Sequence, residues 1–97
     1  MSYRDNIHAL IKGISMEVLS YIKEQETQPQ FTDRWVPAAD IKNSLDLSFV
    51  AVPKANKQYG EKGWFFAIIA RILEDKNLIE YKKVGSRTFC RSLKKDQ

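Results

Sequence analysis

The chain has 97 residues, 43% apolar and 29% charged, a composition that is typical of one soluble globular domain. Its single cysteine excludes a disulfide within the chain, and no apolar run approaches the ~20 residues of a membrane span. The formal charge is +4, but residues 1–46 carry −2 and residues 47–97 carry +6. This asymmetry favours an anionic partner for the second half, such as a nucleic-acid backbone. A solvated surface with one basic half is the alternative.

The first predicted element is a helix over residues 3–26, in which apolar residues recur at helical spacing. Ser2 can cap its start. Gly13 costs about 1 kcal/mol relative to alanine inside a helix. The segment is therefore either one helix or two helices, over residues 3–12 and 14–26. The apolar stripe consists of Ile7, Leu10, Ile11, Ile14, Val18, Tyr21 and Ile22.

The middle of the chain predicts two short elements and a long connection. A polar loop is followed by a very short strand over residues 34–36. Pro37 suits the first position of a second helix, where its missing N–H costs nothing, and this helix ends near Asp46 or Leu47. Residues 48–60 then form an irregular connection, which at this length is often functional.

The last part predicts a third helix and a β-hairpin. The helix covers residues 63–76, with Asn77 as a left-handed C-terminal cap. Strands over residues 78–84 and 88–93 flank a turn at residues 85–87. The expected core side of the helix carries Phe65, Phe66, Ile69, Ile72 and Leu73, and the other side carries Trp64, Ala67, Ala70, Arg71 and Glu74.

This order of elements resembles the winged helix-turn-helix superfamily. Residues 72–83, Ile-Leu-Glu-Asp-Lys-Asn-Leu-Ile-Glu-Tyr-Lys-Lys, are similar to the end of a recognition helix, its turn and the first wing strand. The wing tip matches Gly-Ser-Arg at 85–87, and the second wing strand matches Thr-Phe-Cys-Arg at 88–91. Residues 35–45 resemble the short strand and the first helix of the helix-turn-helix. The resemblance implies an α+β, mainly helical fold with three core helices and a C-terminal two-stranded β-wing.

On this interpretation, residues 14–93 form the winged helix domain. Residues 1–13 are an N-terminal helical extension, and residues 94–97 are a polar tail. Two features depart from the family pattern. The connection between the second and third helices exceeds ten residues, and Arg71 alone on the exposed side of the third helix has base-reading chemistry.

The resemblance implies a protein that binds double-stranded DNA, in the manner of a transcriptional regulator. The third helix would enter the major groove and the wing would touch the backbone. Arg71 is the candidate base contact, and Trp64 either packs on a sugar or base or covers the core edge. The basic residues bind phosphates, or else they are scattered solvated charge. The candidate DNA-binding residues are Lys54, Lys57, Lys62, Trp64, Arg71, Lys82, Lys83, Arg87 and Arg91.

The alternative function is a protein–protein interaction or assembly module on the same fold. It is motivated by Trp64, Ala67 and Ala70, which are apolar where a strong base reader would be charged. We also expect a homodimer, because residues 3–12 add apolar surface beyond what a minimal winged helix needs. The other possibility is that these residues continue the first helix and pack on their own domain.

No catalytic group or cofactor site is predicted, so we expect a protein that is not an enzyme. His8 and the distant Cys90 cannot form a zinc site, which needs four ligands when it is structural. Glu17, Glu24 and Glu26 are expected to form a solvated helix face. The first six residues lack the pattern of a signal peptide, so a cytoplasmic protein without membrane contact is expected.

Overall fold

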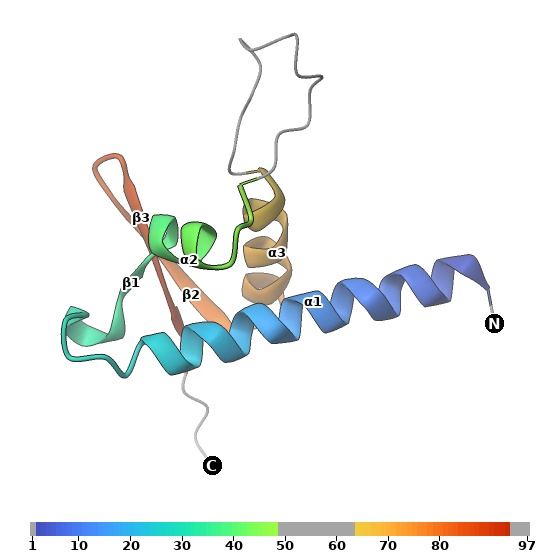
Figure 1. The fold of residues 1–97 in the computed structure, drawn as a ribbon, viewed down its shortest axis with the longest axis horizontal. Coiled ribbons are helices and arrows are strands. Elements are labelled where there is room, and N and C mark those ends of the chain that lie inside the picture. Colours follow the sequence, from blue (N-terminus) through green and yellow to red (C-terminus); the bar gives the residue numbers. More distant parts are fainter. Residues whose placement is uncertain (1, 49–63, 94–97) are drawn as a thin grey trace, which may run out of the picture.

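The computed structural model describes residues 2–48 and 64–93. Within these ranges the fold is α+β and mainly helical, as predicted, with a small antiparallel sheet (Figure 1). Several predicted features lie outside the described residues: the tail at 94–97, the 48–60 connection except for its first residue, and the basic residues Lys54, Lys57 and Lys62. In chain order, the elements are α1 (Tyr3–Gln25), the 3₁₀ turn η1 (Thr32–Arg34), β1 (Val36–Pro37), α2 (Ala38–Ser44), α3 (Trp64–Asp75), β2 (Ile79–Val84) and β3 (Arg87–Ser92).

Helix α1 is continuous, so the considered break at Gly13 does not occur. A break there would forfeit backbone hydrogen bonds and require two more caps, which outweighs the cost of about 1 kcal/mol for one glycine. The hydroxyl of Ser2 accepts a hydrogen bond from the Asp5 N–H at 3.1 Å and caps the helix as predicted. Ser15 is the first buried residue of α1, and the N-terminal half of the helix extends past α3 (Figure 1).

The sheet has the order β1-β3-β2, and both pairs of strands are antiparallel. The β2–β3 hairpin confirms the prediction, although its turn has two residues and Arg87 already belongs to β3. Gly85 has a φ of 62°, a left-handed conformation that costs glycine little. The pairing of β1 with β3 joins segments far apart in the chain, and periodicity within either segment does not predict it.

Strand β1 begins two residues later and ends one residue later than predicted, and Pro37 is the N-cap of α2 rather than its first helical residue. The φ of −60° that the proline ring imposes suits both positions, but a ψ of 132° keeps the residue extended. The predicted cap at Asn77 is confirmed by its φ of 60°. Two backbone hydrogen bonds close the end of α3: the Leu78 N–H donates to the Leu73 carbonyl at 2.9 Å, and the Asn77 N–H donates to the Glu74 carbonyl at 3.0 Å.

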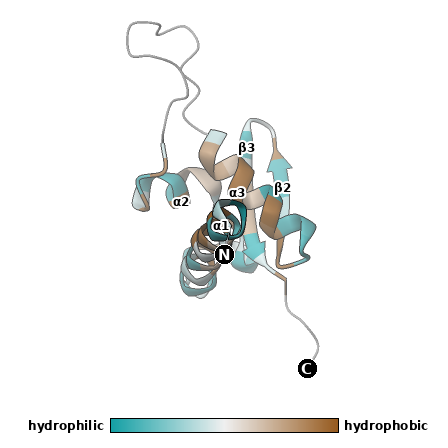
Figure 2. Ribbon diagram, turned by 90° about the vertical axis from the view of Figure 1, so that its right-hand side faces the viewer, coloured by the Kyte–Doolittle hydropathy of each residue, from teal (hydrophilic) through white to brown (hydrophobic). Residues whose placement is uncertain are grey.

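The core lies between the C-terminal half of α1, α2, α3 and one face of the sheet. Hydrophobic segments of α1 and α3 meet there (Figure 2). Ala70 is 3% exposed, so its predicted place on the outer side of α3 is wrong. The helix turns the small Ala70 side chain toward the core because α1 and β2 both pack against α3. The core consists of Val18, Leu19, Ile22, Val36, Ala38, Ile41, Phe66, Ile69, Ala70, Leu73, Ile79 and Cys90.

None of the helices in the described ranges combines the length and the apolar character that a membrane span requires.

Candidate functional site

The face of the sheet that points away from the helical core carries aromatic and basic side chains. Because successive residues of a strand point to opposite faces, the burial of Ile79 and Cys90 assigns their neighbours to this outer face. The register pairs Lys82 with Phe89 and Val84 with Arg87 there. The outer face consists of Glu80, Lys82, Val84, Arg87, Phe89 and Arg91, with Trp35 and Pro37 at β1.

Three cations lie over two aromatic rings on the outer face. The Lys82 ammonium is 4.5 Å from the centroid of the Trp35 ring and 5.8 Å from that of Phe89. The guanidinium carbon of Arg87 is 5.2 Å from the Phe89 centroid, and that of Arg91 is 4.1 Å from the Trp35 centroid. All four distances lie within the ~6 Å range of cation–π attraction. Sequence reasoning identified the three cations but did not identify the two rings that gather them.

The three cations differ in their anionic partners. Arg91 is held in place: its Nε lies 3.0 Å from a carboxylate oxygen of Glu80, and it donates a 2.8 Å hydrogen bond to the Asp33 carbonyl. Lys82 and Arg87 have no ion pair among the described residues. Two cationic groups on this face therefore remain available to an external anion, whereas Arg91 fixes the Trp35 segment to the hairpin.

A hollow of about 400 Å³ lies between the outer face and the segment that precedes β1. Its wall contains three aromatic rings, from Phe31, Trp35 and Phe89, and the two cations of the outer face that have no carboxylate partner within residues 2–48 and 64–93. One carboxylate residue, Asp33, also lines it. The complete lining is Gln30, Phe31, Thr32, Asp33, Trp35, Pro37, Lys82, Val84, Arg87 and Phe89.

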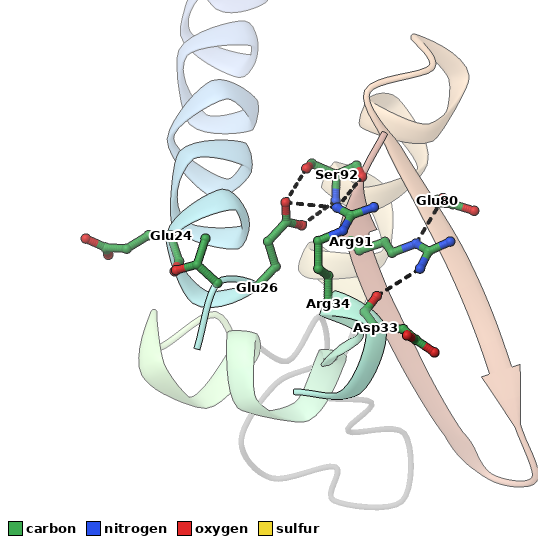
Figure 3. Close-up of polar contacts among 8 residues, drawn as sticks. Glu24, Glu26, Asp33, Arg34, Glu80, Arg91 and Ser92 are labelled. Carbon is green, nitrogen blue, oxygen red and sulfur yellow. Dashed lines mark hydrogen bonds and ion pairs between the residues drawn. The ribbon is translucent and has the colours of Figure 1, made fainter. Parts of the chain in front are cut away.

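A buried carboxylate holds the segment before β1 in place (Figure 3). Glu26 is 7% exposed, which contradicts its expected place on a solvated helix face. It accepts hydrogen bonds from the backbone N–H and the hydroxyl of Ser92, and its Oε2 lies 3.1 Å from Nη1 of Arg34. The direction of the chain after α1 turns Glu26 toward β3, whereas Glu24 points outward (Figure 3).

The same contacts maintain an unusual backbone conformation at Asp33 and Arg34. Their φ angles are 55° and 69°, in the left-handed region, which costs a non-glycine residue roughly 1–2 kcal/mol. The side chain of Arg34 donates to the Ser92 carbonyl, and the carbonyl of Asp33 accepts from Arg91. These long-range contacts compensate for the local strain, so the wall of the hollow has a defined shape.

The exposed side of α3 differs from the outer face of the sheet. Arg71, the predicted base contact, forms an ion pair with Asp75 at 2.9 Å, and that hydrogen bond and charge raise the pKa of Arg71. Trp64 and Ile68 are exposed at the beginning of the helix. Within the described residues, this side of α3 therefore presents a neutralised cation together with apolar groups.

The structure thus separates the predicted DNA-binding residues. Lys82, Arg87 and Arg91 share the outer face, whereas Lys83 points to the opposite face of β2 because it neighbours Lys82 in a strand. Trp64 and Arg71 lie on α3. The aromatic members Trp35 and Phe89 were missed, although the period-two alternation of the second strand would have placed Phe89 on the same face as Arg91.

Cys90 is enclosed by the core. Burial raises the pKa of its thiol to about 12, with a smaller contribution from the charge of Glu74. A thiol in this environment is not a nucleophile at neutral pH. Among residues 2–48 and 64–93, no three His, Cys, Asp or Glu side chains are arranged to hold a metal ion.

The outer face of the sheet, with its hollow and with Lys82 and Arg87, which form no ion pair in the described part of the chain, is the candidate site. Comparisons with protein-family models, with curated proteins and with solved structures found no match for the chain.

Proposed function

We propose that the protein binds DNA through the β2–β3 hairpin. The observation that carries this proposal is the pair of cations, Lys82 and Arg87, on the outer face. They have no carboxylate partner among the described residues and are exposed to solvent. Lysine and arginine side chains held against phosphates release condensed counterions, which is the main source of affinity in non-specific DNA binding.

The winged helix-turn-helix interpretation supports the same function. A short strand, two further helices and a C-terminal hairpin follow α1 in the order that the resemblance implies, and the hairpin would be the wing. The hairpin tip and the beginning of α3 lie on the side of the molecule that is remote from α1 (Figure 1). On this arrangement, one duplex would contact both, with the hairpin against its backbone.

The proposed binding depends on phosphates more than on base sequence. Arg71 already has Asp75 as a partner, so a base contact by Arg71 would first have to break that ion pair. A role as a transcriptional regulator and a cytoplasmic location stay predictions.

The test is a titration of labelled duplex DNA followed by fluorescence anisotropy at 50 and 200 mM salt. We expect binding that weakens with salt. The double variant Lys82→Met/Arg87→Met should lower the slope of log K against log salt by about 2, one for each lost phosphate contact. The matched control is Lys23→Met/Lys76→Met, which removes the same charge from exposed positions outside the hairpin and outside residues 3–12. Absence of binding at 50 mM salt by folded protein, or equal effects of the two double variants, would contradict the proposal.

The second candidate function is a protein-interaction module. The observation that favours it is the apolar beginning of α3, where Trp64 is 37% and Ile68 is 51% exposed. Large exposed apolar side chains that lie close together are typical of docking surfaces. A partner that co-purifies after nuclease treatment, and that is lost on Ile68→Asp but not on Lys82→Met, would favour this function over DNA binding.

We also propose that the protein forms a homodimer through residues 3–12. Tyr3, Ile7 and Leu10 are 88%, 54% and 68% exposed, and with Ile14 they follow the alternating four- and three-residue spacing of a coiled-coil seam. Because this half of α1 extends past α3, a second copy can approach it without contacting the hairpin (Figure 1).

A further inference from the structure

The hollow on the outer face combines a size and a chemistry that fit one small ligand. Its volume of about 400 Å³ lies within the range of about 300–1,000 Å³ that is usual for small-molecule sites. Three aromatic rings form much of its wall, and Lys82 and Arg87 lie at two of those rings. A ligand that uses all of these groups has a flat apolar part and an anionic part.

The two cations can turn from the rings to a bound anion. A cation–π contact at an exposed position is weak, and a phosphate oxygen offers a charge-assisted hydrogen bond instead. Neither Lys82 nor Arg87 would have to break an ion pair with a described residue. The ring faces that they leave are then open to a planar group.

Nucleotides carry both parts in one unit, an aromatic base and a phosphate. Bases within a duplex stack on each other and present only their edges, so the rings of the hollow cannot reach their faces. An unpaired base exposes its face and stacks on aromatic side chains without regard to its identity. Gln30 and Thr32 in the lining add side-chain donors and acceptors for its edge.

We propose that this hollow binds one unpaired nucleoside phosphate, with its base against Trp35 and Phe89 and its phosphate against Lys82 and Arg87. The proposal rests on and deepens the proposed DNA-binding function. Lys82 and Arg87 would contact backbone phosphates in either case: against a duplex the rings of the hollow stay unused, and where a nucleotide has left the stack they take its base. The protein then prefers DNA with a single-stranded segment over a blunt duplex.

The two tryptophans allow a direct measurement. Trp64→Phe leaves Trp35, in the wall of the hollow, as the sole tryptophan. In this background we expect AMP and a short single strand to quench the fluorescence of Trp35. Adenosine and inorganic phosphate, which each carry one half of the ligand, should bind about tenfold more weakly than AMP. Response to the single strand, with or without AMP, supports the proposal and assigns the site to a nucleic acid. Response to AMP alone supports the nucleoside-phosphate site but assigns it to a free nucleotide and contradicts the preference for single-stranded DNA.

Three substitutions in the same background locate the binding. Lys82→Met should weaken AMP binding about tenfold, and Phe89→Leu should weaken it between about fivefold and a hundredfold through loss of stacking. Lys83→Met is the matched control: it removes the same charge from the opposite face of the same strand and should leave AMP binding unchanged. Circular dichroism confirms that each variant is folded.

Two results would overturn the proposal: absence of quenching by both AMP and the single strand, or equal losses for Lys82→Met and Lys83→Met. Titration with blunt duplex DNA tests the proposed DNA-binding function separately. Retained, salt-dependent duplex binding without quenching by nucleotide or single strand rejects the hollow as a nucleotide site and leaves DNA binding by the hairpin intact.

Discussion

The carboxylate of Glu26 accepts hydrogen bonds from both the backbone N–H and the hydroxyl of Ser92, which follows it by 66 positions in the chain. This contact joins the end of α1 to β3. The guanidinium of Arg34 donates to the same carboxylate and to the Ser92 carbonyl, so the segment before β1 is held at the same point (Figure 3). The wall of the hollow therefore depends on a side chain outside it.

Removal of this carboxylate should destabilise the fold. Glu26→Ala removes the shared acceptor of both Ser92 donors and the carboxylate partner of Arg34, which keeps only its hydrogen bond to the Ser92 carbonyl. We expect the free energy of unfolding to fall by about 3 kcal/mol. Urea denaturation followed by circular dichroism measures the change. Glu24→Ala is the control, because Glu24 is exposed and should change stability by less than about 0.5 kcal/mol. Equal effects of the two substitutions would show that the buried contact is not stabilising.

Cys90 should report on global unfolding. In the folded protein its thiol is fully buried and its pKa is raised to about 12, so a thiol reagent at pH 8 should react only with unfolded molecules. The labelling rate should rise with urea in parallel with the loss of helix. Rapid labelling of the folded protein would contradict the described core.

The same thiol predicts a loss of stability in alkali. The folded-state pKa of about 12 lies above the ordinary value of 9.0, so the folded state keeps the proton that the unfolded state releases. This contribution is complete below pH 9 and is lost as the pH rises from 9 toward 12, by at most about 1.4 kcal/mol per pH unit. Cys90→Ala should flatten that part of the profile when denaturant midpoints are measured at pH 8 to 10.5. The slope that remains includes Tyr81, whose pKa is raised mainly by burial.

The cap at Asn77 gives a local prediction about α3. Because Asn77 has a φ of 60°, Asn77→Ala should lower the free energy of unfolding by about 1 kcal/mol, whereas Asn77→Gly should leave it unchanged or raise it slightly. Thermal denaturation of the three proteins distinguishes the order. Greater stability of the alanine variant than of the glycine variant would contradict the left-handed conformation.

The proposed homodimer predicts a mass of two chains in solution. Leu10→Glu places a charge in the exposed seam of α1 and should give a monomer by light scattering at tens of micromolar, without loss of helix. Ala9→Glu adds the same charge on another side of the helix and should leave the dimer intact. A monomeric wild type would reject the proposal, and an unchanged dimer after deletion of residues 1–12 would place the interface elsewhere.

The elements that local periodicity and capping chemistry specify could be predicted from the sequence. The apolar stripe of α1, the helix from Trp64, the hairpin and the caps at Ser2 and Asn77 depend on residues within a few positions of each other. Their hydrogen bonds close within the same segment, so the neighbouring residues carry the necessary information. The basic residues of the hairpin could also be identified, because their charge and their place in a predicted strand are both local properties of the sequence.

Tertiary structure alone decided which of those charges are available and what surrounds them. Glu26 is buried because β3 brings Ser92 to it, and Arg91 loses its availability because Glu80 and the Asp33 carbonyl hold it. Lys82 meets Trp35 only after β1 has paired with β3. Each of these contacts joins residues whose separation along the chain exceeds the period of any helix or strand, and the free energy that selects them comes from packing the whole core.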